Sequence, residues 1–305
     1  MRQARRFSKT ARLRQLSQPG ALILLSGCSA GVLDPQGPVG AAEKMILINS
    51  LGIMMAIAVP TILATLGMAW WFRASNVKAR YRPDWDYSGR VELVTWSIPA
   101  MAILLLGGIA WVGSHDLDPP KPLASTVKPV NVEVVSLDWK WLFIYPDQGI
   151  ASVNRLVVPA GVPISFRLTS ATVMNSFFVP QLGSQIYTMS GMTTRLNLQA
   201  DKPGSYVGLS AQFSGDGFSG MRFRLDAVSA VQYAAWLAVT KGKAPALDAA
   251  SYRELAKPST NVAPIYYGSV PSGMFDAIAV LKPVPVSSSV AAAPREASSS
   301  PSKKV

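Results

Sequence analysis

The sequence contains one cysteine, Cys28, and one histidine, His115, among 305 residues. A single thiol excludes a disulfide within the chain and a Cys-x-x-Cys redox pair. One thiol and one imidazole also fall short of the two histidines and one cysteine of a mononuclear copper site. Bis-histidine haem ligation is excluded for the same reason. The chain alone therefore cannot assemble these transition-metal redox centres.

Charged residues are also scarce, at 15%, whereas 49% of the residues are hydrophobic, and this composition indicates membrane segments. The net charge of +12 is unevenly placed. No basic stripe with interleaved aromatic residues stands out, so nucleic acid is not expected as a partner. A positive leader explains part of the charge, because several cations and no acid precede Cys28: Arg2, Arg5, Arg6, Lys9, Arg12 and Arg14.

Residues 1–27 have the order of a secretory signal peptide, with basic residues, a short apolar run and then small residues. The final stretch, LSGC (25–28), resembles the lipobox of bacterial lipoproteins. In that family the cysteine is lipidated and becomes the new N-terminus, so the resemblance implies a lipid anchor on Cys28. The alternative is an incidental cysteine in a signal-anchor. A lipid anchor would add to true membrane spans.

Two long apolar runs predict transmembrane helices, at residues 45–72 and 91–113. The stretch before them, 28–44, is small and polar and predicts a periplasmic linker. The stretch between them, 73–90, is rich in Arg and Lys, so the positive-inside rule places it in the cytoplasm. The N-terminal anchor and everything after residue 113 are therefore expected on the periplasmic side of a bacterial inner membrane.

The remainder of the chain changes in texture. Short runs rich in Val, Ile, Phe and Tyr alternate with Gly, Pro and Asn turns, which predicts a β-sandwich or barrel within residues 114–228. Residues 229–283 contain helical apolar spacing and predict a helical extension. Residues 284–305 are low-complexity Ser, Ala and Pro and predict a disordered tail. The fold class is a membrane-anchored α+β protein, a two-helix transmembrane hairpin followed by a periplasmic β-sandwich.

Four stretches together resemble subunit II of the haem–copper respiratory oxidases. VELVTWSIP (91–99) resembles the motif that opens the second span of that family, and DWKWLFIYP (138–146) resembles its aromatic strand. VMNSFFVPQLGSQIYTMSGM (173–192) and SAQFSGDGFSGM (210–221) resemble the two segments that carry copper ligands in the copper-binding members. The resemblance extends over nearly the whole chain after Cys28 and implies that the sandwich is cupredoxin-like.

The same resemblance implies that the dinuclear copper site is absent. Non-ligand residues occupy the positions of the family's histidines and cysteines, one methionine remains, and a glutamine takes the carbonyl position: Asn175, Ser210, Gln212, Ser214, Phe218 and Met221. Soft copper requires thiolate and imidazole ligands. The pattern is similar to the quinol-oxidase branch, of the cytochrome bo type. This branch implies electron delivery by a membrane quinol and not by cytochrome c, with haem, copper and the quinol site in subunit I.

Glu92 is the one acid within either apolar run, and an intramembrane carboxylate is a candidate functional residue. It also lies one residue inside the cytoplasmic edge of the span. There it could simply face water and stabilise the N-terminus of the helix electrostatically. The family resemblance implies a role at the entrance of a proton-uptake path. His115 is expected to be an interfacial structural residue. Trp139 and Trp141, two apart, are expected to face one side of a strand.

A copper-bearing cytochrome c oxidase subunit is excluded by the single cysteine and single histidine. A free-standing membrane lipoprotein with a cupredoxin-like binding or assembly role stays open. It would not need two long spans with proline inside or Glu92. No hydrolase or transferase constellation supports a further alternative, because the only histidine lies at the end of the second span, ahead of the predicted strands.

Overall fold

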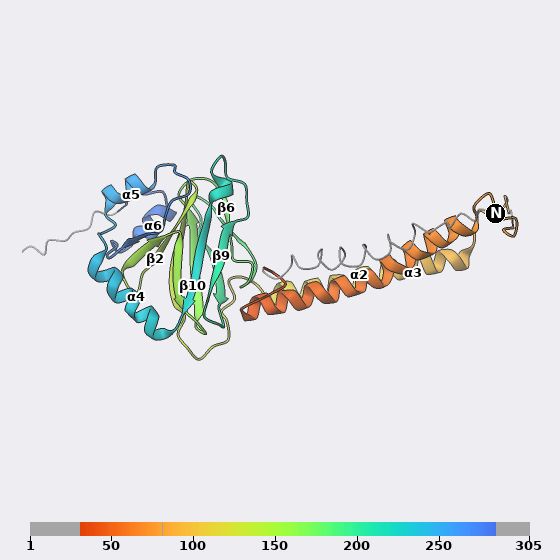
Figure 1. Ribbon diagram of the computed structural model, residues 1–305, viewed down its shortest axis with the longest axis horizontal. Coiled ribbons are helices and arrows are strands. Elements are labelled where there is room, and N and C mark those ends of the chain that lie inside the picture. The colour runs from red at the N-terminus through yellow and green to blue at the C-terminus, as the bar shows by residue number, and fades with distance from the viewer. Residues whose placement is uncertain (1–30, 81, 285–305) are drawn as a thin grey trace, which may run out of the picture.

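The computed structural model describes residues 31–80 and 82–284 and has two parts, a long helical hairpin and a β-sandwich from which the hairpin projects (Figure 1). The predicted class, two membrane-length helices followed by a β-sandwich, is confirmed. The predicted signal peptide, Cys28 and the predicted tail from residue 285 lie outside the described residues.

The hairpin consists of α2 (Pro38–Trp71) and α3 (Gly89–Asp116). Both helices are apolar over more than the length of a bilayer span, and each contains one internal proline, Pro60 or Pro99. Large apolar side chains along both helices are exposed, so this surface is suited to contact lipid or other helices. At the end nearest the sandwich the two helices touch, because a side chain on Gly113 would meet Ile46 at 2.8 Å.

The helix α2 begins seven residues earlier than expected, so the prediction of a linker over 28–44 is wrong for its last part. Pro38 suits the first helical turn, because its missing N–H would have no partner there and its φ is already helical. The backbone N–H of Gly40 donates to the carbonyl of Leu182 at 3.0 Å. The first turn of α2 is therefore held by the sandwich. A helix of 34 residues is about 50 Å long, which exceeds the thickness of the hydrocarbon core of a bilayer. The first turn of α2 can therefore contact the sandwich outside the hydrocarbon core.

The sandwich is built from two sheets. The first has the strand order β11-β3-β2-β1-β5-β8, and the second has the order β4-β10-β9-β6-β7. The strands of the first sheet are β1 (Val130–Leu137), β2 (Lys140–Tyr145), β3 (Ile150–Val153), β5 (Pro163–Ser170), β8 (Thr194–Gln199) and β11 (Ile265–Tyr267). Those of the second are β4 (Arg155–Pro159), β6 (Asn175–Phe178), β7 (Ile186–Thr188), β9 (Gly204–Ser210) and β10 (Arg222–Val228).

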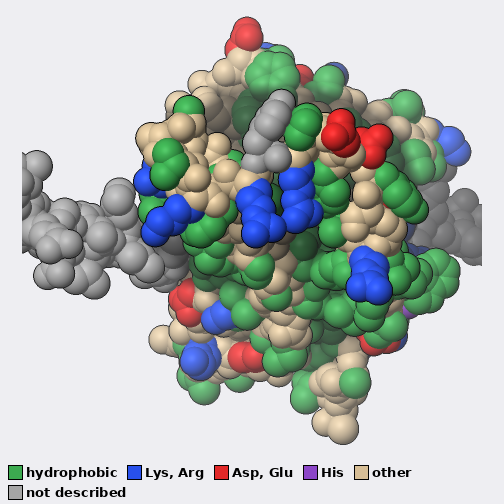
Figure 2. Space-filling view, turned by 90° about the vertical axis from the view of Figure 1, so that its right-hand side faces the viewer, with side chains coloured by type: hydrophobic (Ala, Val, Ile, Leu, Met, Phe, Trp, Pro, Cys, Tyr) green, Lys and Arg blue, Asp and Glu red, His purple; other side chains and the backbone are tan. Residues whose placement is uncertain are grey.

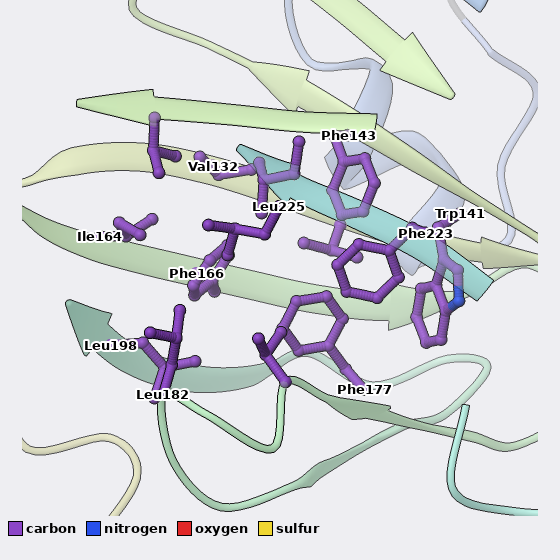
Figure 3. Packing of buried hydrophobic residues seen from close by; sticks show 14 of the residues in the cluster. Val132, Trp141, Phe143, Ile164, Phe166, Phe177, Leu182, Leu198, Phe223 and Leu225 are labelled. Carbon is purple, nitrogen blue, oxygen red and sulfur yellow. The ribbon is translucent and has the colours of Figure 1, made fainter. Parts of the chain in front are cut away.

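Aromatic rings fill the space between the sheets (Figure 3). Phe177 from the second sheet stacks on Phe223 at 5.1 Å between ring centroids. It also meets Trp141 edge-on at 5.4 Å and Phe166 at 5.3 Å, both from the first sheet. All four side chains are almost fully buried. Phe177 thus joins the two sheets at one end of the core, together with Phe223, which lies 5.1 Å from Phe143 and 5.8 Å from Trp141 of the first sheet.

The expectation that Trp139 and Trp141 share one face of a strand is wrong. Trp139 has φ of 64° and lies with Asp138 in the two-residue turn between β1 and β2. A left-handed residue interrupts the alternation of side chains, and period-two reasoning holds only inside a strand. Both rings nevertheless pack against the same core, Trp141 within it and Trp139 at its edge.

The chain after β10 forms an arm around the first sheet. It contains α4 (Ala230–Lys243), α5 (Ala249–Leu255), β11 and α6 (Met274–Ala279). Helices were expected over most of this region, whereas the strand β11, which extends the first sheet beside β3, was not. Ser229 caps α4 in a capping box, and Asp248 caps α5. Apolar side chains from α5, β11 and α6 build a second core on the outer face of the sheet.

Lys140 fastens this arm to the sandwich. Its side chain is almost fully buried, and its ammonium donates to the carbonyl of Lys257 at 2.7 Å and to the hydroxyl of Ser259 at 2.6 Å. Burial lowers the pKa of Lys140, and Asp138 acts in the opposite direction. A second tie lies nearby, because the side-chain amide of Asn154 donates to the carbonyl of Val262 at 2.8 Å.

The Phe177→Ala substitution should lower the free energy of unfolding of the sandwich by about 3–5 kcal/mol, because it opens a cavity where both sheets meet. Urea denaturation of the detergent-solubilised protein, followed by near-ultraviolet circular dichroism, measures this change. The matched control is Val231→Ala on the exposed side of α4, which should stay within about 0.5 kcal/mol. Equal stability of the two variants would contradict the central place of Phe177.

The Lys140→Met substitution should loosen the arm by about 1–3 kcal/mol, because it leaves buried acceptors without their donor. Limited digestion with a protease that does not depend on lysine should then cut residues 257–262 faster than in the wild type. Lys282→Met removes an exposed lysine and is the control. Unchanged cleavage in the Lys140 variant would mean that the second core alone holds the arm.

Candidate functional site

The six positions expected to replace copper ligands come together at one end of the second sheet. Asn175 is the first residue of β6, and Ser210 is the last residue of β9. Residues 211–221, here called the site loop, then run through the short 3-10 helix η2 (Phe218–Gly220) and return to β10. The site loop carries the other four positions, so the sequence identified residues that are neighbours in space.

The polar half of this cluster is a chain of neutral hydrogen bonds. The hydroxyl of Ser210 lies 3.1 Å from the side-chain oxygen of Asn175 and 3.2 Å from the carbonyl of Gln212. The amide nitrogen of Asn175 donates to the carbonyl of Val173 at 3.2 Å. Asn175 and Ser210 are both buried. Their polar atoms therefore satisfy one another and carry no charge.

The other half is apolar. Met221 is buried at the edge of the main core, and the hydroxyl of Ser214 lies 4.0 Å from its sulfur. Phe218 packs edge-on against Phe213, with 5.7 Å between the ring centroids. Phe218 is the residue expected to replace a ligand histidine, and its phenyl ring offers no lone pair to a metal.

These donors do not fit a copper centre. A dinuclear copper centre of this kind needs thiolate bridges and imidazoles, and here only hydroxyls, an amide, a backbone carbonyl and one thioether converge. Among residues 31–80 and 82–284, no group of three His, Cys, Asp or Glu side chains comes together as a metal site. No redox step can be derived through the site loop.

Trp139 and the arm cover the site loop from outside. The indole nitrogen of Trp139 donates to the carbonyl of Ser214 at 2.9 Å. A side chain on Gly217 would collide with the Trp139 ring and would lie 2.6 Å from the methyl group of Thr260. A side chain on Gly220 would lie 2.7 Å from the side-chain oxygen of Asn261. Glycine at 217 thus leaves the space that the Trp139 ring occupies, and glycine at 220 lets the side chain of Asn261 approach the loop closely.

Sequence reasoning missed these covering contacts. The glycines of the site loop are visible in the sequence, and they signal close approach of something to the backbone. Nothing in the sequence pairs them with Thr260 and Asn261, because the arm is some forty residues further along the chain. Lys140 also gave no signal, since an isolated lysine is usually exposed.

Glu92 and His115 lie at opposite ends of α3 and do not form a common site. Glu92 is in the first turn, at the loop end of the hairpin, and its side chain is exposed. His115 is in the last turn, where its Nδ1 lies 2.8 Å from the carbonyl of Trp111 and its ring lies 4.5 Å from the indole. At about 1.5 Å per residue, the two lie about 35 Å apart along the helix. These local contacts suit a packing role for His115.

Two family models match the chain after the hairpin. The model described as the cytochrome c oxidase subunit II periplasmic domain matches residues 147–228, which include the site loop. The model described as the COX aromatic rich motif matches residues 241–280, which form most of the arm. The first match shows that the sandwich is a cupredoxin-like domain of the kind found in the periplasmic part of subunit II.

Curated relatives match over most of their own length. The chain is 49% identical to the cytochrome bo(3) ubiquinol oxidase subunit 2 of Pseudomonas aeruginosa, over 87% of this chain and 80% of that one. It is 48% identical to the ubiquinol oxidase subunit 2 of Acetobacter aceti, over 88% of each. It is 40% identical to the quinol oxidase subunit 2 of Bacillus cereus, over 83% of this chain and 87% of that one. The chain belongs to the subunit 2 family of the ubiquinol oxidases.

Proposed function

We propose that the chain is the non-metallated subunit II of a quinol:oxygen oxidoreductase in the aerobic respiratory chain of the inner membrane. The observation that carries this proposal is the cluster at the copper positions, where neutral hydrogen bonds and a phenyl ring replace thiolates and imidazoles. A quinol is lipid-soluble and delivers electrons inside the membrane. An oxidase that accepts quinol does not need a periplasmic copper relay.

Haem, copper and the quinol site are assigned to the partner subunit I, and this chain holds no catalytic group of its own. Its contribution is assembly. The apolar faces of α2 and α3 are exposed along the hairpin, and they supply a surface for the helices of subunit I. The hydrogen-bonded contact between the start of α2 and the sandwich holds the periplasmic domain over that partner.

The cover over the site loop supports a donor other than cytochrome c. Trp139 is itself hydrogen-bonded to the loop, and the arm closes over it through Thr260 and Asn261. A soluble donor that approached this end would meet the arm and not an electron-accepting centre. Cys28 as a lipid anchor in the periplasmic leaflet completes the proposed topology, with two spans between it and the sandwich.

Glu92 is proposed to collect protons at the cytoplasmic entrance of the oxidase. It stands in the first turn of α3, at the end of the hairpin opposite the periplasmic domain, with its side chain exposed. No described cation forms an ion pair with it. A carboxylate without a fixed partner can exchange protons with water and pass them to a neighbouring subunit.

Purification of the tagged chain in mild detergent should yield a haem-containing complex that consumes oxygen with a reduced quinol. Reduced cytochrome c should give no uptake above the rate without donor, because the site loop has no copper to accept its electrons. An oxygen electrode measures both rates on one preparation. A preparation without haem and without quinol-driven uptake would instead favour the free-standing lipoprotein.

The Glu92→Gln substitution should slow proton uptake by the reconstituted complex several-fold, while haem content and subunit composition stay unchanged. The amide keeps the size of the side chain and removes its ability to exchange a proton. Stopped-flow measurement of proton uptake in vesicles follows the effect. Asp116→Asn, at the other end of α3, is the control. Equal rates for both variants and the wild type would remove Glu92 from the proton path.

A further inference from the structure

The loop that joins α2 to α3 borders an open cavity at the end of the hairpin remote from the sandwich. The cavity has a volume of about 900 Å³ and lies between the end of α2 and residues up to Trp85. Basic and aromatic side chains line it together, among them Trp71, Lys78, Arg80, Arg82 and Trp85. Figure 2 looks at the molecule from the loop end of the hairpin and shows Lys and Arg side chains gathered there beside hydrophobic ones.

The wall of the cavity is built by contacts that end α2. The guanidinium of Arg73 lies 4.7 Å from the ring centroid of Trp70 and donates to the carbonyl of Trp70 at 2.8 Å and to the hydroxyl of Ser75 at 3.0 Å. The side-chain amide of Asn76 donates to the carbonyl of Trp71 at 2.5 Å. These bonds satisfy carbonyls that the last helical turn leaves without partners. Arg73 is thus occupied in closing the helix.

The other three cations of the cavity have no ionic partner among the described carboxylates. Lys78, Arg80 and Arg82 are exposed, and none of the ion pairs of the described residues includes them. Asp84 and Asp86 follow closely in the sequence, yet neither pairs with them. Three unpaired cations around one hollow create a positive potential that favours a multiply hydrogen-bonding anion.

The position of the cavity relative to the bilayer indicates which kind of anion it binds. It begins where α2 ends, at Trp71, and the apolar, exposed faces of the two spans continue directly from it. Tryptophan at the end of a span marks the headgroup level of the bilayer. An occupant whose phosphate lies among the cations would therefore have its apolar part beside α2. A free phosphate would gain nothing from Trp71, Phe72 and Trp85.

We propose that this cavity binds the headgroup of an anionic phospholipid of the cytoplasmic leaflet. Lys78, Arg80 and Arg82 contact the phosphate, and the acyl chains run along the apolar end of α2. The proposal does not rest on the proposed oxidase function, since it depends only on the membrane placement of the hairpin. Anionic lipids are attracted to clusters of Lys and Arg immediately beyond a span. Here such a cluster lines a cavity that can hold the headgroup.

The test uses the whole complex in nanodiscs of phosphatidylcholine that contain phosphatidylglycerol with a photoreactive headgroup. Crosslinks are mapped by mass spectrometry on residues 71–85. Wild-type protein should crosslink in this segment in a saturable manner. The triple variant Lys78→Gln, Arg80→Gln, Arg82→Gln should lose affinity on the order of 100-fold, because each cation near the surface contributes roughly a fivefold factor.

Two matched variants separate the site from general charge. Lys241→Gln, Lys243→Gln, Lys282→Gln removes three exposed lysines of the arm and should leave crosslinking unchanged. Arg80→Lys, Arg82→Lys keeps the charges and should retain most of the binding, and it guards against misfolding of the loop. Equal crosslinking in the wild type and the triple glutamine variant would overturn the proposal. So would equal capture of photoreactive phosphatidylcholine, or full displacement by inorganic phosphate, which would mark a site for free anions.

Discussion

The packing of Phe177 between the two sheets is the contact on which the arrangement of the site depends. Phe177 is the strand partner of Ser210, and Asn175 lies two residues before it on β6. The stacked ring of Phe223 belongs to β10, which begins directly after the site loop. Both ends of the site loop are therefore anchored in the aromatic core (Figure 3). The aromatic core therefore holds the site loop at both of its ends.

Asn175 and Ser210 stand at two of the positions expected to replace copper ligands, and their amide and hydroxyl groups pair at no cost in buried charge. At a third of these positions, Phe218 packs against Phe213. On its outer side, the site loop is covered by Trp139 and by the arm. The arm in turn is tied by Lys140, whose buried ammonium donates to two acceptors on the arm and also to the carbonyl of Asp138 at 3.3 Å.

Sequence reasoning succeeded where the physical cause is local or compositional. The two spans follow from long apolar runs, and the β-sandwich follows from alternating short runs and turns. The six substituted positions followed from a pattern of residues, and the structure places them together. It failed where the cause is a contact distant in the sequence. The early start of α2 depends on Leu182, and the cover of the site loop depends on Thr260 and Asn261.

The position of Trp139 illustrates the same limit within a few residues. The resemblance to the family's aromatic strand implies a strand through 138–146, but the turn places Trp139 in a left-handed conformation. That conformation is unfavourable for a bulky residue and persists only when the surroundings hold it. Here the carbonyl of Ser214 binds the indole, and glycine at 217 leaves space for the ring. The sequence of the turn alone contains neither partner.

The two ends of the hairpin then serve different purposes. At the sandwich end, the backbone of Gly40 at the start of α2 is hydrogen-bonded to the sandwich. At the loop end, Glu92 stands close in sequence to Arg80, Arg82 and Arg90, all of them exposed. Cations alone would repel protons from this surface, because like charges disfavour each other's approach. An anionic headgroup among them offsets that repulsion at this end of the hairpin. Proton entry at Glu92 and a lipid phosphate in the cavity are thus electrostatically compatible, and the lipid would favour the role proposed for the acid.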